Sequence, residues 1–249
     1  KPGATLVLSE TDPQLYDIFV GEGPEVTWLA GRDFAVESNT TAVGGRFVDL
    51  RTPGSTYEGI YLPLHGRYQA DNFMDALAGA EAFFGHPLGH QIVADAAAAV
   101  SSPGRLEVVG QRPLVVLDGA KNLAGAHSSA AALTEEFGAE RSRVLVVGML
   151  AGKSATEMLE ALEAQKARLV VTCPPPSPRA QPAEAVAEAA RSLGCRTIAT
   201  GSVAEALEVA LGEAGADELV LVTGSLYVVG EARAVLLSQP GLEPSGRLS

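Results

Sequence analysis

Residues 103–127 read PGRLEVVGQRPLVVLDGAKNLAGAH, and the rest of the chain is organised around this stretch. The run at 114–117 is apolar and β-branched at its centre, which predicts a buried strand in the middle of a parallel sheet. A small-residue loop follows at 118–122, and a helix is predicted from 124 to 137. A strand that ends in Asp118-Gly119 and then turns into a helix places polar side chains at the carboxyl edge of a parallel sheet. Ligands bind at that edge in open α/β folds.

The chemistry of this stretch suits a phosphate. Arg105 and Lys121 supply positive charge, and the start of the following helix supplies free N–H groups. A plain structural interpretation accounts for the same residues, because Asp-Gly after a strand is often only a turn and Asn122 can simply cap the helix. The spacing alone leaves both interpretations open.

Composition narrows the class of protein. The chain has 249 residues, of which 47% are hydrophobic, and a net charge of −12. This is enough apolar sequence for one or two globular domains, and the negative charge disfavours a nucleic-acid surface or an anionic membrane surface. No membrane-spanning run and no signal peptide are visible in the sequence. Two cysteines do not make a disulfide framework, so location in a reducing cytoplasm is expected. The four histidines lack the spacing of metal ligands, so no metal site is expected from them.

The pattern changes along the chain at a linker, residues 101–104. Before it, short strands are predicted at 5–8, 26–29, 34–38, 46–51 and 57–62, and alanine-rich helices at 72–84 and 92–100. After it, strands at 114–117, 144–147, 169–172, 197–199 and 219–222 alternate with helices at 124–137, 156–165, 182–193 and 203–213. An added antiparallel strand is expected at 106–109, a last helix at 228–237 and a frayed tail from Gln239. Repeated β–α units predict an α/β fold with a mainly parallel sheet and helices on both faces, and a domain boundary between 102 and 103.

A second phosphate-loop candidate is GMLAGKS at residues 148–154. A Walker A loop needs four residues between its glycines, and here there are three. A plain turn between a strand and a helix, with Ser154 as the N-cap, is therefore favoured.

Several segments together resemble one family. They are residues 1–4; 62–64 with Gln69, Asn72 and Ala76; 103–107; 118–120 with Asn122; 147–150 with Lys153; 177–180 before 182–184; and 223–229. In this order they resemble the C-terminal part of dihydrofolate synthase/folylpolyglutamate synthase, a relative of the Mur ligases. Each segment is a weak signal, but together they span essentially the whole chain.

The resemblance implies a fold and an activity. Residues 103–249 would form a Rossmann-like C-terminal domain, and residues 1–102 the C-terminal part of a central α/β ATPase domain. Such enzymes use ATP and Mg²⁺ to phosphorylate the carboxylate of a pteroate or folate, and the amine of L-glutamate then attacks the acyl phosphate. The resemblance implies that the metal ligands lie upstream of Lys1, so the fragment alone is expected to be inactive. The expected partners are small-molecule substrates, with no nucleic acid and no membrane, and the full-length protein is expected to be a cytoplasmic monomer.

The resemblance also implies roles for particular residues. The expected ATP contacts are Asn72, Arg105 and Asp118, the expected catalytic positions are Lys121 and Ser225, and possible phosphate or substrate contacts are Asn122 and Lys153. This chain departs from the family in having Lys121 where histidine is usual and Leu123 where proline is usual. Gly152 and Ser154 also stand where acids are usual. Lysine can hold a phosphate but cannot perform the proton chemistry of histidine near neutral pH.

Two other classes of function remain as alternatives. One is a non-catalytic nucleotide- or ligand-binding module derived from the same family. The other is an independent P-loop NTPase, supported only by residues 152–154. The sequence leaves open the pterin form and the number of glutamates added.

Overall fold

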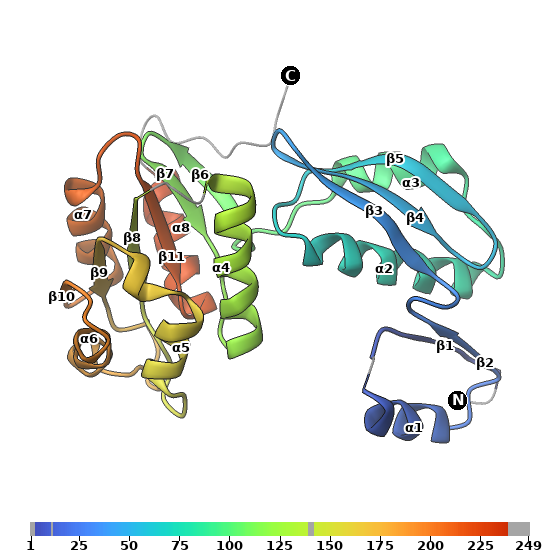
Figure 1. The fold of residues 1–249 in the computed structure, drawn as a ribbon, viewed down its shortest axis with the longest axis horizontal. Helices are drawn as coiled ribbons and strands as arrows, with labels where there is room; N and C mark the ends of the chain where they lie inside the picture. Colours follow the sequence, from blue (N-terminus) through green and yellow to red (C-terminus); the bar gives the residue numbers. More distant parts are fainter. Residues whose placement is uncertain (1–2, 11, 139–141, 239–249) are drawn as a thin grey trace. The chain divides into compact units, whose positions relative to one another are not determined.

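The structure, a computed structural model, describes residues 3–10, 12–138 and 142–238. The chain divides into two compact units, Lys1–Ser101 and Ser102–Ser249 (Figure 1). The division falls one residue before the boundary drawn from the sequence. The fraying expected from Gln239 lies outside the described residues. None of the helices in these described ranges is both long enough and apolar enough to cross a membrane.

The described part of the first unit contains two small sheets. Its elements are β1 (Thr5–Leu8), α1 (Pro13–Gly21), β2 (Val26–Leu29), β3 (Ala35–Ala42), β4 (Gly45–Arg51), β5 (Thr56–Leu62), α2 (Tyr68–Phe84) and α3 (His90–Ala99). Strands β1 and β2 pair in parallel, and β3, β4 and β5 form an antiparallel sheet. Val48 and Ile60 from the antiparallel sheet pack with Met74 of α2 and Val93 of α3 to form the core.

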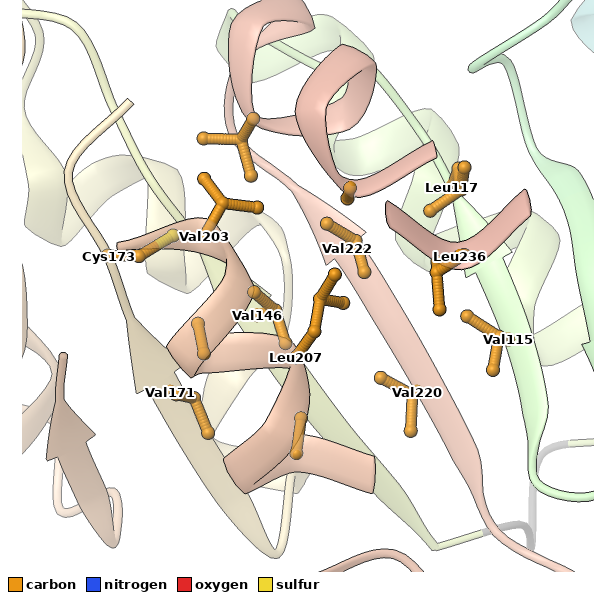
Figure 2. Packing of buried hydrophobic residues seen from close by; sticks show 14 of the residues in the cluster. Val115, Leu117, Val146, Val171, Cys173, Val203, Leu207, Val220, Val222 and Leu236 are labelled. Atoms are coloured by element: carbon orange, nitrogen blue, oxygen red, sulfur yellow. The ribbon is translucent and has the colours of Figure 1, made fainter. Parts of the chain in front are cut away.

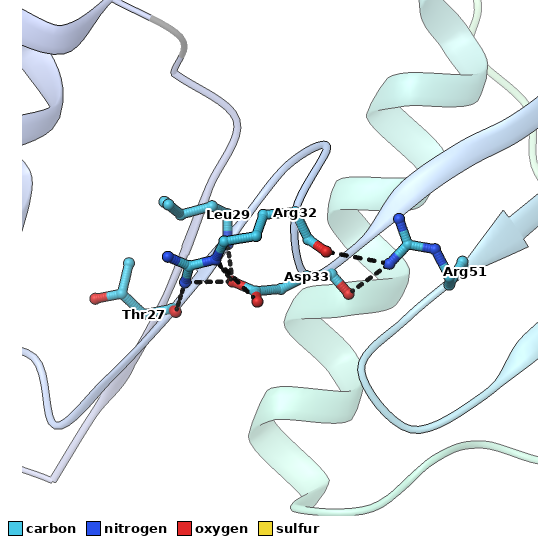
Figure 3. Close-up of polar contacts among 5 residues, drawn as sticks. All are labelled: Thr27, Leu29, Arg32, Asp33 and Arg51. Carbon is cyan, nitrogen blue, oxygen red and sulfur yellow. Dashed lines mark hydrogen bonds and ion pairs between the residues drawn. The ribbon is translucent and has the colours of Figure 1, made fainter.

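A polar cluster ties β2 to the antiparallel sheet within this unit (Figure 3). The Asp33 carboxylate accepts hydrogen bonds from the Leu29 amide at 2.8 Å and from the Arg32 guanidinium. Arg51 donates to the carbonyls of Arg32 and Asp33. The hydrogen bond from Arg32 is the largest cause that lowers the pKa of Asp33. The cluster therefore holds the turn between the two sheets in a defined conformation.

The second unit is built on one sheet. Its elements are β6 (Glu107–Gln111), β7 (Leu114–Leu117), α4 (Leu123–Phe137), β8 (Arg143–Val147), α5 (Ala155–Ala161), β9 (Leu169–Thr172), α6 (Ala183–Ser192), β10 (Thr197–Ala199), α7 (Val203–Glu213), β11 (Leu219–Thr223) and α8 (Leu226–Leu237). Among the described residues the strand order is β10-β9-β8-β11-β7-β6, with β6 antiparallel to β7 and the other pairs parallel. The mainly parallel α/β fold and the added antiparallel strand are both confirmed.

Several element bounds shift from the predicted ones, for example in β3 and α2, and two differences in the second unit are larger. Strand β7 is not central, because β11, the last strand in the described sequence, lies between β7 and β8 and leaves β7 second from the edge. The helix predicted at 156–165 ends at Ala161 and continues only as the 3₁₀ turn Ala164–Lys166. Glu163 adopts a left-handed conformation, with φ of 54°, which interrupts the helical hydrogen-bonding pattern.

The core explains why these strands are apolar on both faces. Val115, Val146 and Val220 point toward α7 and α8 and pack there with Leu207 and Leu236 (Figure 2). The alternate residues of the same strands are buried on the other face, which carries α4, α5 and α6 (Figure 1). Each fully buried valine or leucine contributes about 1.5–3 kcal/mol. Because the parallel strands point the same way, the loops after β7, β8 and β9 lie at one edge of the sheet.

Candidate functional site

Asp118 follows β7 and turns its carboxylate into the protein. Its backbone amide donates to the Val222 carbonyl at 3.0 Å, which extends the pairing of β7 with β11. The side chain is only 3% exposed. It accepts hydrogen bonds from the Leu106 amide at 3.4 Å and from the Ser129 hydroxyl of α4. Burial raises the pKa of Asp118, and these two bonds and the nearby charge of Arg105 oppose that rise.

The turn that carries Arg105 is fixed against the loop after β7. Arg105 donates from Nη1 to the Gly119 carbonyl at 3.0 Å, and the Gly119 amide donates to the Gly104 carbonyl at 2.7 Å. A Cβ at Gly119 would lie 2.3 Å from a terminal methyl group of Leu226, so a larger residue there would require the Leu226 side chain to move. Leu106 has a φ of 49°, a strained conformation that its bond to Asp118 helps to hold. Arg105 therefore lies near Asp118, and contact of either residue with ATP stays a prediction.

A cavity of about 250 Å³ lies between the loops that follow β7 and β8. Its lining consists of Lys121, Asn122, Leu123, Gly152, Lys153, Ser154, Glu157 and Met158. The two loops are far apart in the sequence, but each follows a strand that neighbours β11. The fold thus brings together Lys121, Asn122 and Lys153, three of the residues singled out in the sequence.

The cavity has a positive electrostatic character. The pKa of Lys153 is lowered, first by burial and then by the positive charges of Lys121 and Arg179. An anion placed between these cations would relieve their repulsion, so the site is suited to a carboxylate or a phosphate. Glu157 contributes a carboxylate to the same lining. The cavity could therefore bind a molecule that carries both negative charge and an ammonium group.

Three of the polar side chains at this edge of the sheet are helix caps. Asn122 accepts from the Gly125 amide at 2.9 Å, and Ser154 accepts from the Glu157 amide at 3.3 Å. Ser225 is 2% exposed and caps α8. Such caps typically contribute about 1 kcal/mol. Residues 148–154 thus form the expected strand-to-helix turn, and Asn122 both caps α4 and lines the cavity.

The remaining predicted residues lie elsewhere. Asn72 is in α2 of the first unit, where its amide donates to Gln69 at 3.0 Å. Ser225, Arg105 and Asp118 are in the second unit but outside the lining of the cavity.

Sequence reasoning missed two residues of this region. Ser129 has no visible signal, because it is one serine in an alanine-rich helix. Gln181 directly follows the family-like segment 177–180, which was a usable signal. Among the described residues no three His, Cys, Asp or Glu side chains gather in a group that could hold a metal ion.

Comparison with known proteins gives one consistent result. Residues 104–226 match the family model of the Mur ligase, glutamate ligase domain. The chain is 35% identical, over 96% of its length and 53% of the relative, to a dihydrofolate synthase/folylpolyglutamate synthase of Mycobacterium tuberculosis. It is 30% identical, over 84% of its length and 48% of the relative, to a folylpolyglutamate synthase of Lacticaseibacillus casei.

Solved structures agree with these relatives. The structure of Mycobacterium tuberculosis folylpolyglutamate synthase complexed with ADP matches with a TM-score of 0.87 and 35% identity, over 97% of this chain and 56% of that one. The chain thus spans about half the length of the relatives it matches. Its residues 104–226 therefore form a domain of the Mur ligase, glutamate ligase type, and the chain is similar to the C-terminal part of dihydrofolate synthase/folylpolyglutamate synthases.

Proposed function

We propose that this chain is the C-terminal part of an ATP-dependent ligase that joins L-glutamate to dihydropteroate or tetrahydrofolate through an acyl phosphate. The observation that carries the proposal is the cavity that brings Lys121, Lys153 and Glu157 together inside a Mur ligase glutamate ligase domain. Residues 1–102 would be the end of the central ATPase domain. Residues 103–249 would be the C-terminal domain.

The cavity matches the chemistry of an amino-acid substrate. L-glutamate carries two carboxylates, which Lys121 and Lys153 would bind by charge-assisted hydrogen bonds. Its ammonium group would pair with Glu157. In the reaction the ammonium group would first lose a proton to Glu157 or to water, and the resulting amine would attack the acyl phosphate, so that an amide bond forms and phosphate leaves. Arg105 is the guanidinium that would neutralise the phosphate of ATP.

Further residue roles belong to the same proposal. Lys121 and Ser225 would act as catalytic residues, and Asn72 and Asp118 would complete the ATP contacts. Asn122 would contact phosphate or substrate. The magnesium ligands would come from the part of the relatives that this chain does not span.

The proposal is tested by binding and by turnover. L-glutamate should bind to the chain in a calorimetric titration, and Lys153→Met should weaken that binding. Lys166→Met is the matched control, because Lys166 is exposed and pairs with Glu163. If Lys166→Met loses glutamate binding and Lys153→Met does not, the assignment of the cavity is refuted.

The second test measures turnover. With ATP and tetrahydrofolate present the chain alone should show no ligation, and observed turnover would refute its assignment as an incomplete enzyme.

A binding module without turnover is the second candidate. It is favoured by Asp118 and Ser225, two predicted site residues that already serve internal hydrogen bonds. The gene distinguishes the two candidates. An open reading frame that continues upstream of Lys1 into a Walker A loop supports the ligase, and a start codon directly before Lys1 supports the module.

A further inference from the structure

The loop after β9 lies against the loop that carries Lys153. The Ala151 amide donates to the Arg179 carbonyl at 2.7 Å, and the Gln181 amide donates to the Met149 carbonyl at 2.8 Å. Leu150 and Ala180 form an antiparallel bridge between these two bonds. The two loops thus form a short ladder of backbone hydrogen bonds at the edge of the sheet.

The side chain of Gln181 extends this ladder. Its Nε2 donates to the Leu150 carbonyl at 3.1 Å and to the Lys153 carbonyl at 2.9 Å. The single carboxamide therefore spans the turn from 150 to 153. Both Nε2 hydrogens are used, so the turn is closed at its two ends by one side chain.

The turn needs such a restraint for two reasons. Gly152 has a φ of 87°, so the turn contains a residue with wide conformational freedom. Lys153 is also repelled by the positive charges of Lys121 and Arg179, which would favour a conformation with its ammonium group farther from the cavity. The bonds from Gln181 oppose that movement, because they fix the carbonyl of Lys153 itself.

We propose that Gln181 is a positioning residue that holds Lys153 at the cavity for binding of an anionic substrate group. The inference rests on the proposed function, since L-glutamate is the probe of the site. Gln181 acts through the backbone of Lys153 and is not itself in the lining of the cavity.

The test compares Gln181→Met with the wild-type chain. Methionine has a similar length and cannot donate to either carbonyl. L-glutamate should bind about tenfold more weakly, because the turn would no longer be held in the conformation that places Lys153 at the cavity. The pKa of Lys153, followed by NMR of its side chain, should rise toward the usual lysine value as Lys153 leaves its partly buried, positive surroundings. Gln91→Met is the control, because Gln91 is exposed and bonds only the side chain of Asp95.

The outcomes separate this inference from the proposed function. Unchanged glutamate affinity together with an unchanged Lys153 pKa in Gln181→Met would overturn the positioning role. No glutamate binding by the wild type would overturn the proposed substrate, while the shift in Lys153 pKa would still support the positioning role. If Gln181→Met does not fold, hydrogen exchange measured on the wild-type chain tests the positioning role instead. Slow solvent exchange of the Gln181 Nε2 hydrogens supports the role, and fast exchange refutes it.

Discussion

Replacement of Asp118 by alanine should destabilise the second unit. Leu106 is fully buried and Ser129 is 1% exposed, and both use the Asp118 carboxylate as hydrogen-bond acceptor. A buried donor left without a partner costs about 1–3 kcal/mol. Two such donors would cost roughly 2–6 kcal/mol, but the Ser129 hydroxyl can turn to a carbonyl of its own helix, and removal of a buried charge offsets part of the loss. The expected net loss is about 2–4 kcal/mol.

Asparagine at the same position should be tolerated. Its Oδ1 can accept from the Leu106 amide, and its Nδ2 can donate to the Ser129 hydroxyl, so both partners remain satisfied. The expected change is below about 1 kcal/mol. The contrast between alanine and asparagine therefore tests the hydrogen bonds themselves rather than the volume of the side chain.

Chemical denaturation followed by circular dichroism, together with amide exchange in β7 and β11, measures both variants. Asp217→Ala is the control in the same unit, because the Asp217 side chain is 93% exposed. The reasoning is refuted if Asp118→Ala lies within about 0.5 kcal/mol of the wild type, the range of ordinary surface changes. It is also refuted if asparagine is as damaging as alanine. A loss of ATP use in Asp118→Ala must be compared with this stability loss before it is assigned to a contact.

The pH dependence of the same pair has a defined sign. Burial raises the pKa of Asp118 in the folded protein, so the folded state binds more protons than the unfolded state between the unfolded and the raised pKa. The wild type should therefore gain stability relative to Asp118→Asn as the pH falls through that window. A stability difference that does not change with pH would contradict the burial of an ionisable group at this position.

Three further predictions concern single residues. Lys153→Met should raise the melting temperature at pH 7, because the lowered pKa of Lys153 means that its charged form is disfavoured in the folded state; a lower melting temperature would contradict this. Gly224→Ala should lower the free energy of unfolding by about 1–3 kcal/mol in denaturant titrations, because φ is 98° and a Cβ would lie 2.6 Å from the Gly148 carbonyl oxygen. Gly230→Ala is the control: it lies in open space on α8 and should be neutral or stabilising. Burial raises the pKa of Cys173 to about 12, so iodoacetamide at pH 8 should label it only after unfolding, and labelling of the native protein would be the contrary result.

Local pattern was enough to predict most elements of the second unit. The apolar runs at Leu114–Leu117 and Leu169–Thr172 and the helix Val203–Glu213 have the predicted bounds. Strands that are apolar on both faces implied helices on both sides of a parallel sheet, and the structure has them. These features depend on residues that are close together in the chain, so a short segment of sequence is enough to predict them.

Tertiary structure alone decided which of these elements meet. The last strand, β11, enters between β7 and β8, and the loops that follow those two strands then enclose Lys121 and Lys153 around one cavity. The contacts of Ser129 with Asp118 and of Gln181 with the Lys153 turn were also hidden, since the partners are 11 and 28 residues apart in the sequence. Sequence periodicity records which face of an element is buried. The strand order and the side chains that meet across it depend on packing between distant segments, and no local pattern encodes that packing.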